Sequence, residues 1–463
     1  MARLPRKAVF DPHEVGVYHC INRCVRRTRL CGIDLLTGKS YEHRKRWLQN
    51  RLMFLAGVMA IDVEGFTLMS NHLHAILRNR PDIADRWSAE EVARRWLKVC
   101  PPYRPGACEP VGQPTELEIA AIVNNPQRVA ELRLRLSNPS WLMRFLTEKL
   151  ARVANREDEV TGRFWEGRFK MQRLLDEWAV AACLVYVDLN PLRAGIARVP
   201  DNCEYTSLFE RLGGIMESFL EGLDEREKRE YGVCSGSPEP VPCGNGTIPT
   251  DRAFSPVKAS DVAQSRHPAP FAPTSGVQDS VLEETAAGPG NSAFGENGYP
   301  KLRQWKLSEI AGGMTAHPRS AWLAPLEISE SLLQKPVPAC RASNLGCLNM
   351  TISQYLQLLE WTGRNWRNPE SSPEAGPNPA KSTASPTETP EICRQLGLDG
   401  EAWLKFVAMF GGKKKRRAAG RPEALQAEAV KRGRRWIHGI AQSREIFGQH
   451  QIEQVVQQTS SCG

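Results

Sequence analysis

The sequence has no run of 18 consecutive apolar residues, the length that a membrane-spanning helix needs. No apolar segment follows the basic residues at the start of the chain, so we expect no secretory signal peptide. None of the 13 cysteines forms a Cys-x-x-Cys pair, which argues against the common structural zinc sites. An odd number of cysteines in such a chain is typical of reduced, intracellular thiols. These absences predict a protein of the cytoplasm that makes no contact with a membrane.

The chain also lacks internal repeats, and its 36 glycines and 33 prolines are concentrated late in the sequence. A length of 463 residues is enough for two or three domains. The net charge of +9 is a modest basic excess. Such an excess suits a polyanionic partner but does not by itself select nucleic acid.

The domain organisation follows from these shifts in composition. We expect one folded domain over residues 12–212, with a helical insertion at about 80–138. The chain after it is expected to be a largely disordered C-terminal extension, because Pro, Gly and Ser are frequent there. Its parts are predicted as a linker at 233–300, a small helical segment at 301–367, a second linker at 368–390 and a basic helical tail at 401–455.

Within residues 12–212 the hydrophobic pattern alternates between strand and helix periods. Strands are predicted at 15–25, 61–70, 71–79 and 169–175, and helices at 43–60, 141–155 and 176–189. Without the insertion, the order is strand, helix, strand, strand, helix, strand. This order predicts an α+β protein of the ferredoxin-like, split βαβ kind, an antiparallel sheet with helices on one face.

Two histidines on the third predicted strand are the first candidates for chemistry. His72 and His74 flank one leucine. Side chains alternate between the faces of a strand, so both imidazoles point the same way. Two neighbouring imidazoles can hold one divalent cation. Two polar side chains on a solvent-facing strand are the plainer alternative.

A tyrosine and an asparagine on the last predicted helix strengthen the metal hypothesis. Tyr186 and Asn190 are four residues apart and therefore share one helix face. A tyrosine oxygen can attack phosphorus and remain covalently bound, and a cation can polarise the scissile phosphate. The amide oxygen of Asn190 suits Mg²⁺ or Mn²⁺. The alternatives are core packing for Tyr186 and helix termination before Pro191 for Asn190.

These segments resemble the single-tyrosine transposases of the HUH nuclease superfamily, and most closely the REP-associated tyrosine transposases. The resemblance lies in His72-Leu73-His74, in residues 186–195, and in segments 18–23 and 162–170. It covers roughly residues 12–212. It implies that Tyr186 is the nucleophile, that His72, His74 and Asn190 hold Mg²⁺ or Mn²⁺, and that cleavage leaves a 5′-phosphotyrosine and a 3′-hydroxyl.

The same resemblance implies a DNA nicking and strand-transfer enzyme of a bacterial mobile element, associated with the nucleoid. Its partner would be single-stranded DNA with hairpins at the element ends, and a homodimer is compatible with the family. The insertion at 80–138 and the chain after about residue 213 depart from the compact members. Basic residues, several of them beside aromatic ones, are candidates to contact DNA: Arg23, Arg26, Arg163, Arg168, Lys170 and Arg193.

Two other functions are compatible with these residues. One is a domesticated or inactive relative that binds hairpin nucleic acid without cutting it. The other is a metal-stabilised scaffold whose C-terminal half binds proteins. A complete set of two histidines, a tyrosine and an asparagine favours the nuclease, because a site without catalytic function would not require all four residues.

Overall fold

The computed structural model describes residues 6–25, 30–33, 38–102, 113–194, 203–222, 319–366, 390–395, 398–412 and 416–448. The linker predicted at 233–300 lies outside these residues, and so does the linker predicted at 368–390 apart from Pro390. The segments predicted at 301–367 and 401–455 are described in large part.

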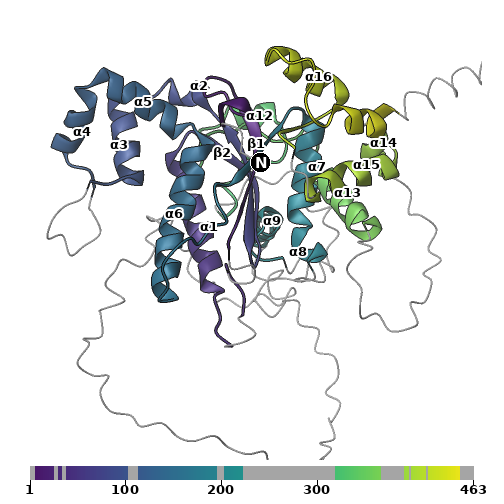
Figure 1. Cartoon of the computed structure of the whole chain (residues 1–463), viewed down its shortest axis with the longest axis horizontal. Coiled ribbons are helices and arrows are strands. Elements are labelled where there is room, and N and C mark those ends of the chain that lie inside the picture. Colours follow the sequence, from purple (N-terminus) through teal and green to yellow (C-terminus); the bar gives the residue numbers. More distant parts are fainter. Residues whose placement is uncertain are drawn as a thin grey trace, which may run out of the picture.

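One five-stranded sheet forms the centre of the molecule (Figure 1). Its strands are β1 (Gly16–Arg23), β2 (Ile61–Leu68), β3 (His72–Asn79), β4 (Lys170–Leu174) and β5 (Ala418–Ala419). They are arranged in the order β2-β3-β1-β4-β5. The first three pairings are antiparallel, and β5 joins β4 in parallel. The first four strands thus have the ferredoxin-like order, and the predicted α+β fold is confirmed.

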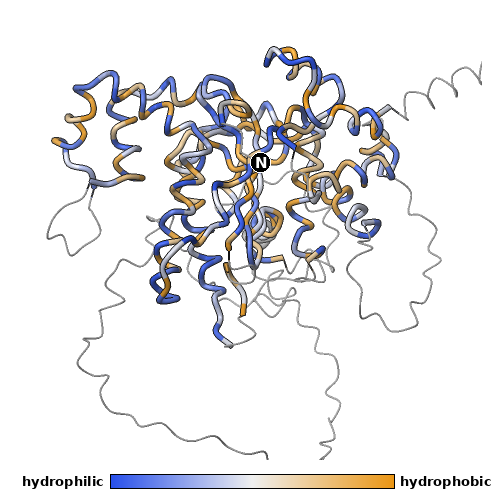
Figure 2. Tube along the Cα trace, in the orientation of Figure 1, coloured by the Kyte–Doolittle hydropathy of each residue, from blue (hydrophilic) through white to orange (hydrophobic). Residues whose placement is uncertain are grey.

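Helices cover both faces of this sheet. The helices that precede β2 and β4, α1 (His43–Val58) and α6 (Pro139–Glu157), pack together against one face, as predicted. The opposite face is covered by α7 (Glu177–Asp188), which the prediction of helices on one face did not include. The reason is in the sequence of α7, whose ten residues from Ala179 to Asp188 are all buried. A helix that is apolar on every side needs a partner on every side, and Figure 2 shows its apolar character.

The insertion between β3 and β4 is helical. Its helices are α2 (Pro81–Ala84), α3 (Ala89–Val99), α4 (Glu116–Val123) and α5 (Pro126–Leu136). The N-terminus of α3 is capped by Ser88, and that of α4 by a capping box from Thr115 and Glu118. In Figure 1, α3 and α4 lie at the side of the molecule away from α7.

The described parts of the C-terminal extension are helical and pack onto the sheet domain. They include α9 (Ser207–Gly222), α12 (Glu330–Leu333), α13 (Ile352–Asn365), α14 (Glu391–Gln395), α15 (Gly400–Ala408), the 3-10 turn η5 (Met409–Gly411) and α16 (Pro422–Lys431). Residues of α13 and α15 share one hydrophobic core with α7. Across the described ranges, no helix is long and apolar enough to span a bilayer.

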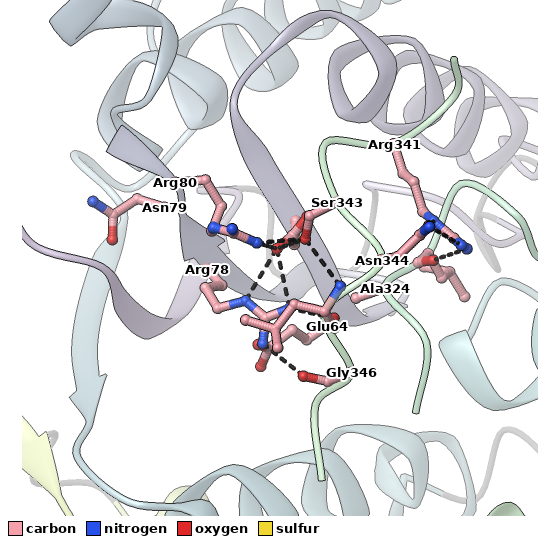
Figure 3. Close-up of polar contacts among 12 residues, drawn as sticks. Glu64, Arg78, Asn79, Arg80, Ala324, Arg341, Ser343, Asn344 and Gly346 are labelled. Atoms are coloured by element: carbon pink, nitrogen blue, oxygen red, sulfur yellow. Dashed lines mark hydrogen bonds and ion pairs between the residues drawn. The ribbon is translucent and has the colours of Figure 1, made fainter. Parts of the chain in front are cut away.

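A buried ionic network attaches the segment around residue 343 to the sheet (Figure 3). The Arg78 guanidinium pairs with Asp62 and with Glu64, each at 3.0 Å, and donates to the carbonyl oxygen of Gly346 at 2.8 Å. The Ser343 hydroxyl donates to Asp62 at 2.8 Å. Two charged side chains of the sheet, Arg78 and Asp62, are thereby satisfied in part by the extension, so the two regions are coupled in stability.

The protonation of Glu64 should make this coupling depend on pH. Burial raises the pKa of Glu64 to about 7, although Arg78 opposes the shift. The folded state therefore holds the proton more tightly than the unfolded state, where the pKa is 4.5. The stabilising contribution is complete below pH 4.5 and is lost as pH rises through 7.

We expect the wild-type protein to lose about 2 kcal/mol of stability relative to Glu64→Gln between pH 5 and pH 8. Urea unfolding at both pH values measures this difference. The exposed Glu360→Gln variant is the control and should show no such trend. Parallel pH profiles for wild type and Glu64→Gln would contradict the prediction.

Candidate active site

Strand β3 and helix α7 bring the two predicted histidines and the predicted tyrosine together. Alternation along β3 directs Leu73 into the α1 and α6 core, and His72 and His74 to the face that α7 covers. The ring centroids of His72 and His74 are 4.9 Å apart, and those of His74 and Tyr186 are 5.6 Å apart. His74 is buried and His72 half-buried, so the site is open on the His72 side.

Hydrogen bonds orient the rings of both histidines. His74 Nδ1 lies 2.8 Å from His19 Nε2, and His74 Nε2 lies 3.2 Å from the side-chain amide of Asn190. His72 Nδ1 lies 2.5 Å from the side-chain oxygen of Asn71, an acceptor that suits a proton on this nitrogen. If His74 likewise donates from Nδ1, the lone pair of each ring is on Nε2. A partner on one ring nitrogen that fixes the other as ligand is common in metal sites.

His19 is a further member of this site. It is 1% exposed, and its ring stacks on that of His74 with centroids 5.1 Å apart. Its centroid is 6.2 Å from that of Tyr186. The sequence contains one indication of this role, a polar side chain at position 19 in a predicted strand. The structure places that strand, β1, in the middle of the sheet. Its contact with His74 depends on the pairing of β1 with β3, which local periodicity does not determine.

Tyr186 is held in a buried but polar position. Its side chain is 5% exposed, and burial raises the pKa of its phenol. The nearby Arg193 guanidinium, together with hydrogen bonds from Asn190 and Arg193, lowers the pKa and partly offsets this effect. Asn190 and Arg193 reach the phenol because α8 (Asn190–Arg193) directly follows α7. A phenol beside a cation is better prepared to act as a nucleophile than one in an apolar core.

Residues of the C-terminal extension pack around the Tyr186 ring. The ring centroids of Trp366 and Phe410 lie 6.0 and 6.2 Å from that of Tyr186. The Arg193 guanidinium lies 4.1 Å from the centroid of the Trp366 ring. A Cβ on Gly411 would lie 3.3 Å from a ring carbon of Tyr186. None of these three residues was a candidate from sequence, because no local pattern connects them to Tyr186, which lies 180 to 225 residues earlier in the chain.

The residues predicted to contact DNA lie at different distances from the histidines in the sheet. Arg23 and Lys170 are both exposed. Arg23 lies directly opposite His72 in the pairing of β1 with β3. Lys170 lies opposite Ile21 on β1, and Ile21 in turn lies opposite His74. Arg193 lies at the tyrosine, as described above. Arg163 and Arg168 are exposed in the loop before β4. Arg26 lies outside the described residues.

The two aromatic residues of that loop belong to the core. Phe164 is 2% exposed, and Trp165 donates its indole N–H to the carbonyl oxygen of Thr147 at 2.9 Å. Both rings therefore pack in the protein interior. The loop is fixed to the end of β1 by the hydrogen bond from the Glu166 N–H to the Arg23 carbonyl oxygen.

The donor atoms at this site suit a cation with mixed nitrogen and oxygen ligands. No group of three His, Cys, Asp or Glu side chains that could hold a metal occurs in the described part of the chain. A cation at His72 and His74 would therefore need the Asn190 amide as its third protein ligand. The oxygen and nitrogen of that amide exchange places by a simple flip, after which Oδ1 would face the histidines.

Comparisons with known proteins give little beyond these observations. No protein-family model matches the chain, and no curated protein matches it. A solved structure described as the REP-associated tyrosine transposase bound to a REP hairpin is similar over 46% of this chain and 86% of that chain. The identity is 9% and the TM-score 0.27. A similarity of this size does not assign a function to this chain.

Proposed function

We propose that the protein is a metal-dependent nuclease and strand transferase of single-stranded DNA, with Tyr186 as the nucleophile. The observation that carries the proposal is the convergence of four side chains from β3, α7 and α8. His72 and His74 from β3 meet Tyr186 near the end of α7 and Asn190 at the start of α8, with His74 in contact with Asn190. Paired imidazoles that can hold a cation, beside a phenol with a guanidinium next to it, suit phosphodiester cleavage through a covalent intermediate.

The proposed reaction exchanges one phosphoester for another. The Tyr186 oxygen attacks the scissile phosphorus, the bond from tyrosine to phosphorus forms, and the bond from phosphorus to the 3′ oxygen breaks. The phenolic proton ends on that 3′ oxygen, which leaves a 5′-phosphotyrosine and a free 3′-hydroxyl. Because the phosphoester energy is retained, a second strand end can reverse the step without water.

The residues around Tyr186 have separate roles in this proposal. Arg193 stabilises the phenolate and the negative charge on the scissile phosphate. His19 positions the His74 ring. A Mg²⁺ or Mn²⁺ held by His72, His74 and Asn190 would neutralise charge on the non-bridging phosphate oxygens. Arg23 on β1 and Lys170 on β4, both exposed, are placed to guide the DNA strand by its phosphates.

The test is incubation of the whole protein with labelled single-stranded DNA that carries a hairpin, with and without Mn²⁺. We expect a covalent protein–DNA adduct that needs the metal and disappears in Tyr186→Phe, because the phenylalanine ring has no oxygen to attack. Tyr41→Phe is the matched control and should retain the adduct. An adduct that persists in Tyr186→Phe would assign the chemistry to another residue.

A second function is favoured by one observation, the 5% exposure of Tyr186 beneath Trp366 and Phe410. A protein in which these rings never separate would bind hairpin nucleic acid without cutting it. Tight binding with no adduct on any hairpin tested would establish this second function and overturn the first.

A further inference from the structure

A cationic surface lies on the extension, next to the sheet edge formed by β5. We call it the α16 surface and define it by Arg416, Arg417, Arg434, Arg435 and Trp436. Between residues 416 and 436 the sequence has seven basic side chains and two acidic ones. Arg416 and Arg417 directly precede β5, and residues 434–436 follow the end of α16.

One of the two acidic side chains of this region, Glu428, is paired with arginines outside the α16 surface. Glu428 is 5% exposed and pairs with Arg173 and Arg432, and Lys431 pairs with Glu14. The four arginines of the α16 surface have no carboxylate partner in the described parts of the chain. Positive charge without a counter-charge indicates that an anion from outside completes the surface.

Two of these arginines are also partly desolvated. Burial lowers the pKa of Arg417, and repulsion from Arg434 and Arg432 lowers it further. Arg416 has one guanidinium nitrogen, Nη1, that is buried without a hydrogen-bond partner among the described residues. Both arrangements cost free energy in the protein alone, and a phosphate oxygen would relieve both.

The exposed aromatic residue beside the arginines narrows the choice of anion. Trp436 is 66% exposed and directly follows Arg434 and Arg435, which are exposed as well. Arginines supply contacts to phosphates, and an exposed indole supplies an apolar face against which the sugars between those phosphates can pack. A small inorganic anion would not contact the indole. Arginines together with an exposed tryptophan therefore indicate nucleic acid.

The α16 surface is fixed rigidly to the sheet that carries the histidines. The Arg173 N–H donates to the Arg417 carbonyl oxygen at 2.7 Å, and the Arg421 N–H donates to the Asp176 carboxylate at 2.6 Å. β5 lies beside the end of β4, whose first residue, Lys170, is one strand removed from His74. Along β4 the two positions are separated by roughly 10 Å. A nucleic acid seated at the histidines would therefore have its adjoining part within reach of the α16 surface.

We propose that the α16 surface binds the phosphate backbone of the double-stranded stem next to the strand in the active site. The backbone at Arg417 is bonded to β4, and arginines carried on folded backbone suit the regular phosphate spacing of a duplex better than the variable spacing of a single strand. The placement of the stem beside the active site rests on the proposed function. The affinity of the α16 surface for a stem does not, so each of the two proposals can be disproved without the other.

The test uses the full chain with Arg434→Gln and Arg435→Gln combined. The probe is a fluorescent DNA hairpin with no single-stranded flank, and its Kd is measured over a series of salt concentrations. We expect the double variant to bind about tenfold more weakly or worse, and the slope of log K against log salt to fall by about 2. The combined Arg144→Gln and Arg152→Gln variant is the control, because both side chains are exposed on α6. The control should bind like wild type.

Two outcomes would overturn the proposal. One is equal stem binding by the double variant and the wild type. The other is an equal loss of affinity for an unstructured single strand, which would make the surface a general polyanion site. A failure of the proposed function shows instead as absence of adduct in the wild-type protein, whatever the stem affinity. Circular dichroism should show unchanged folding, because both arginine side chains are exposed.

Discussion

Replacement of His74 by alanine is expected to lower the rate of adduct formation by about a thousandfold. The change removes the imidazole that lies between His19 and Asn190. A metal that has lost this ligand would no longer stabilise the charged phosphate, a contribution of several kcal/mol, and each 1.36 kcal/mol is a factor of about ten in rate. Affinity for the hairpin should change little, because the phosphate contacts proposed for DNA come from arginines and lysine.

Single-turnover adduct formation with saturating Mn²⁺ measures this loss. His13→Ala, an exposed histidine, is the control and should match wild type. His19→Ala should fall between the two, with a loss of about 10- to 100-fold, because it removes only the hydrogen bond that orients His74. Higher Mn²⁺ should rescue His19→Ala in part, whereas a merely structural defect would not respond to the metal. Normal rates in His74→Ala would contradict a metal role for this residue.

The largest effect on stability is expected for Arg78→Ala, with a loss of about 3–5 kcal/mol in the free energy of unfolding. Arg78 is 5% exposed and is the cation shared by Asp62 and Glu64. Its removal leaves two buried carboxylates with less compensation and also deprives the Gly346 carbonyl oxygen of a donor. The cost arises from desolvated charge, which the protein cannot screen.

Chemical denaturation of the full chain measures the change. Arg364→Ala is the matched control, since this arginine pairs with Glu360 on an exposed face of α13 and should cost less than about 1 kcal/mol. Because the network links the sheet to the segment around Ser343, limited proteolysis should cut this segment faster in Arg78→Ala. Similar losses in the two variants would refute a special role for the buried network.

Local patterns in the sequence predict the elements of the sheet domain closely. The strand predicted at 71–79 is observed at 72–79, and the helix predicted at 176–189 is observed at 177–188. Periodicity suffices here because each element has clear amphipathic or fully apolar character and Pro191 follows the helix. The strand order follows from the same information, because few topologies accommodate this sequence of elements.

Contacts between distant segments could not be predicted in this way. His19 reaches His74 through strand register, and Trp366 and Phe410 reach Tyr186 through helix packing across long stretches of chain. The one available signal was α7 itself. A helix that is apolar on all sides exposes apolar surface to water if only a sheet packs against it. The sequence of α7 therefore predicts a second layer of protein on its other side.

The occupied edges of the sheet restrict how two copies of the chain could associate. At one edge β5 takes up hydrogen bonds of Arg173 and Leu175. At the other edge, the Leu68 N–H donates to the Tyr205 carbonyl oxygen, and the Ala324 N–H donates to the Val63 carbonyl oxygen. At these positions a second chain cannot add a strand, because the backbone groups that it would need are already bonded. Strand addition by a second copy is therefore blocked at these positions, and the sheet is protected there from growing into aggregates.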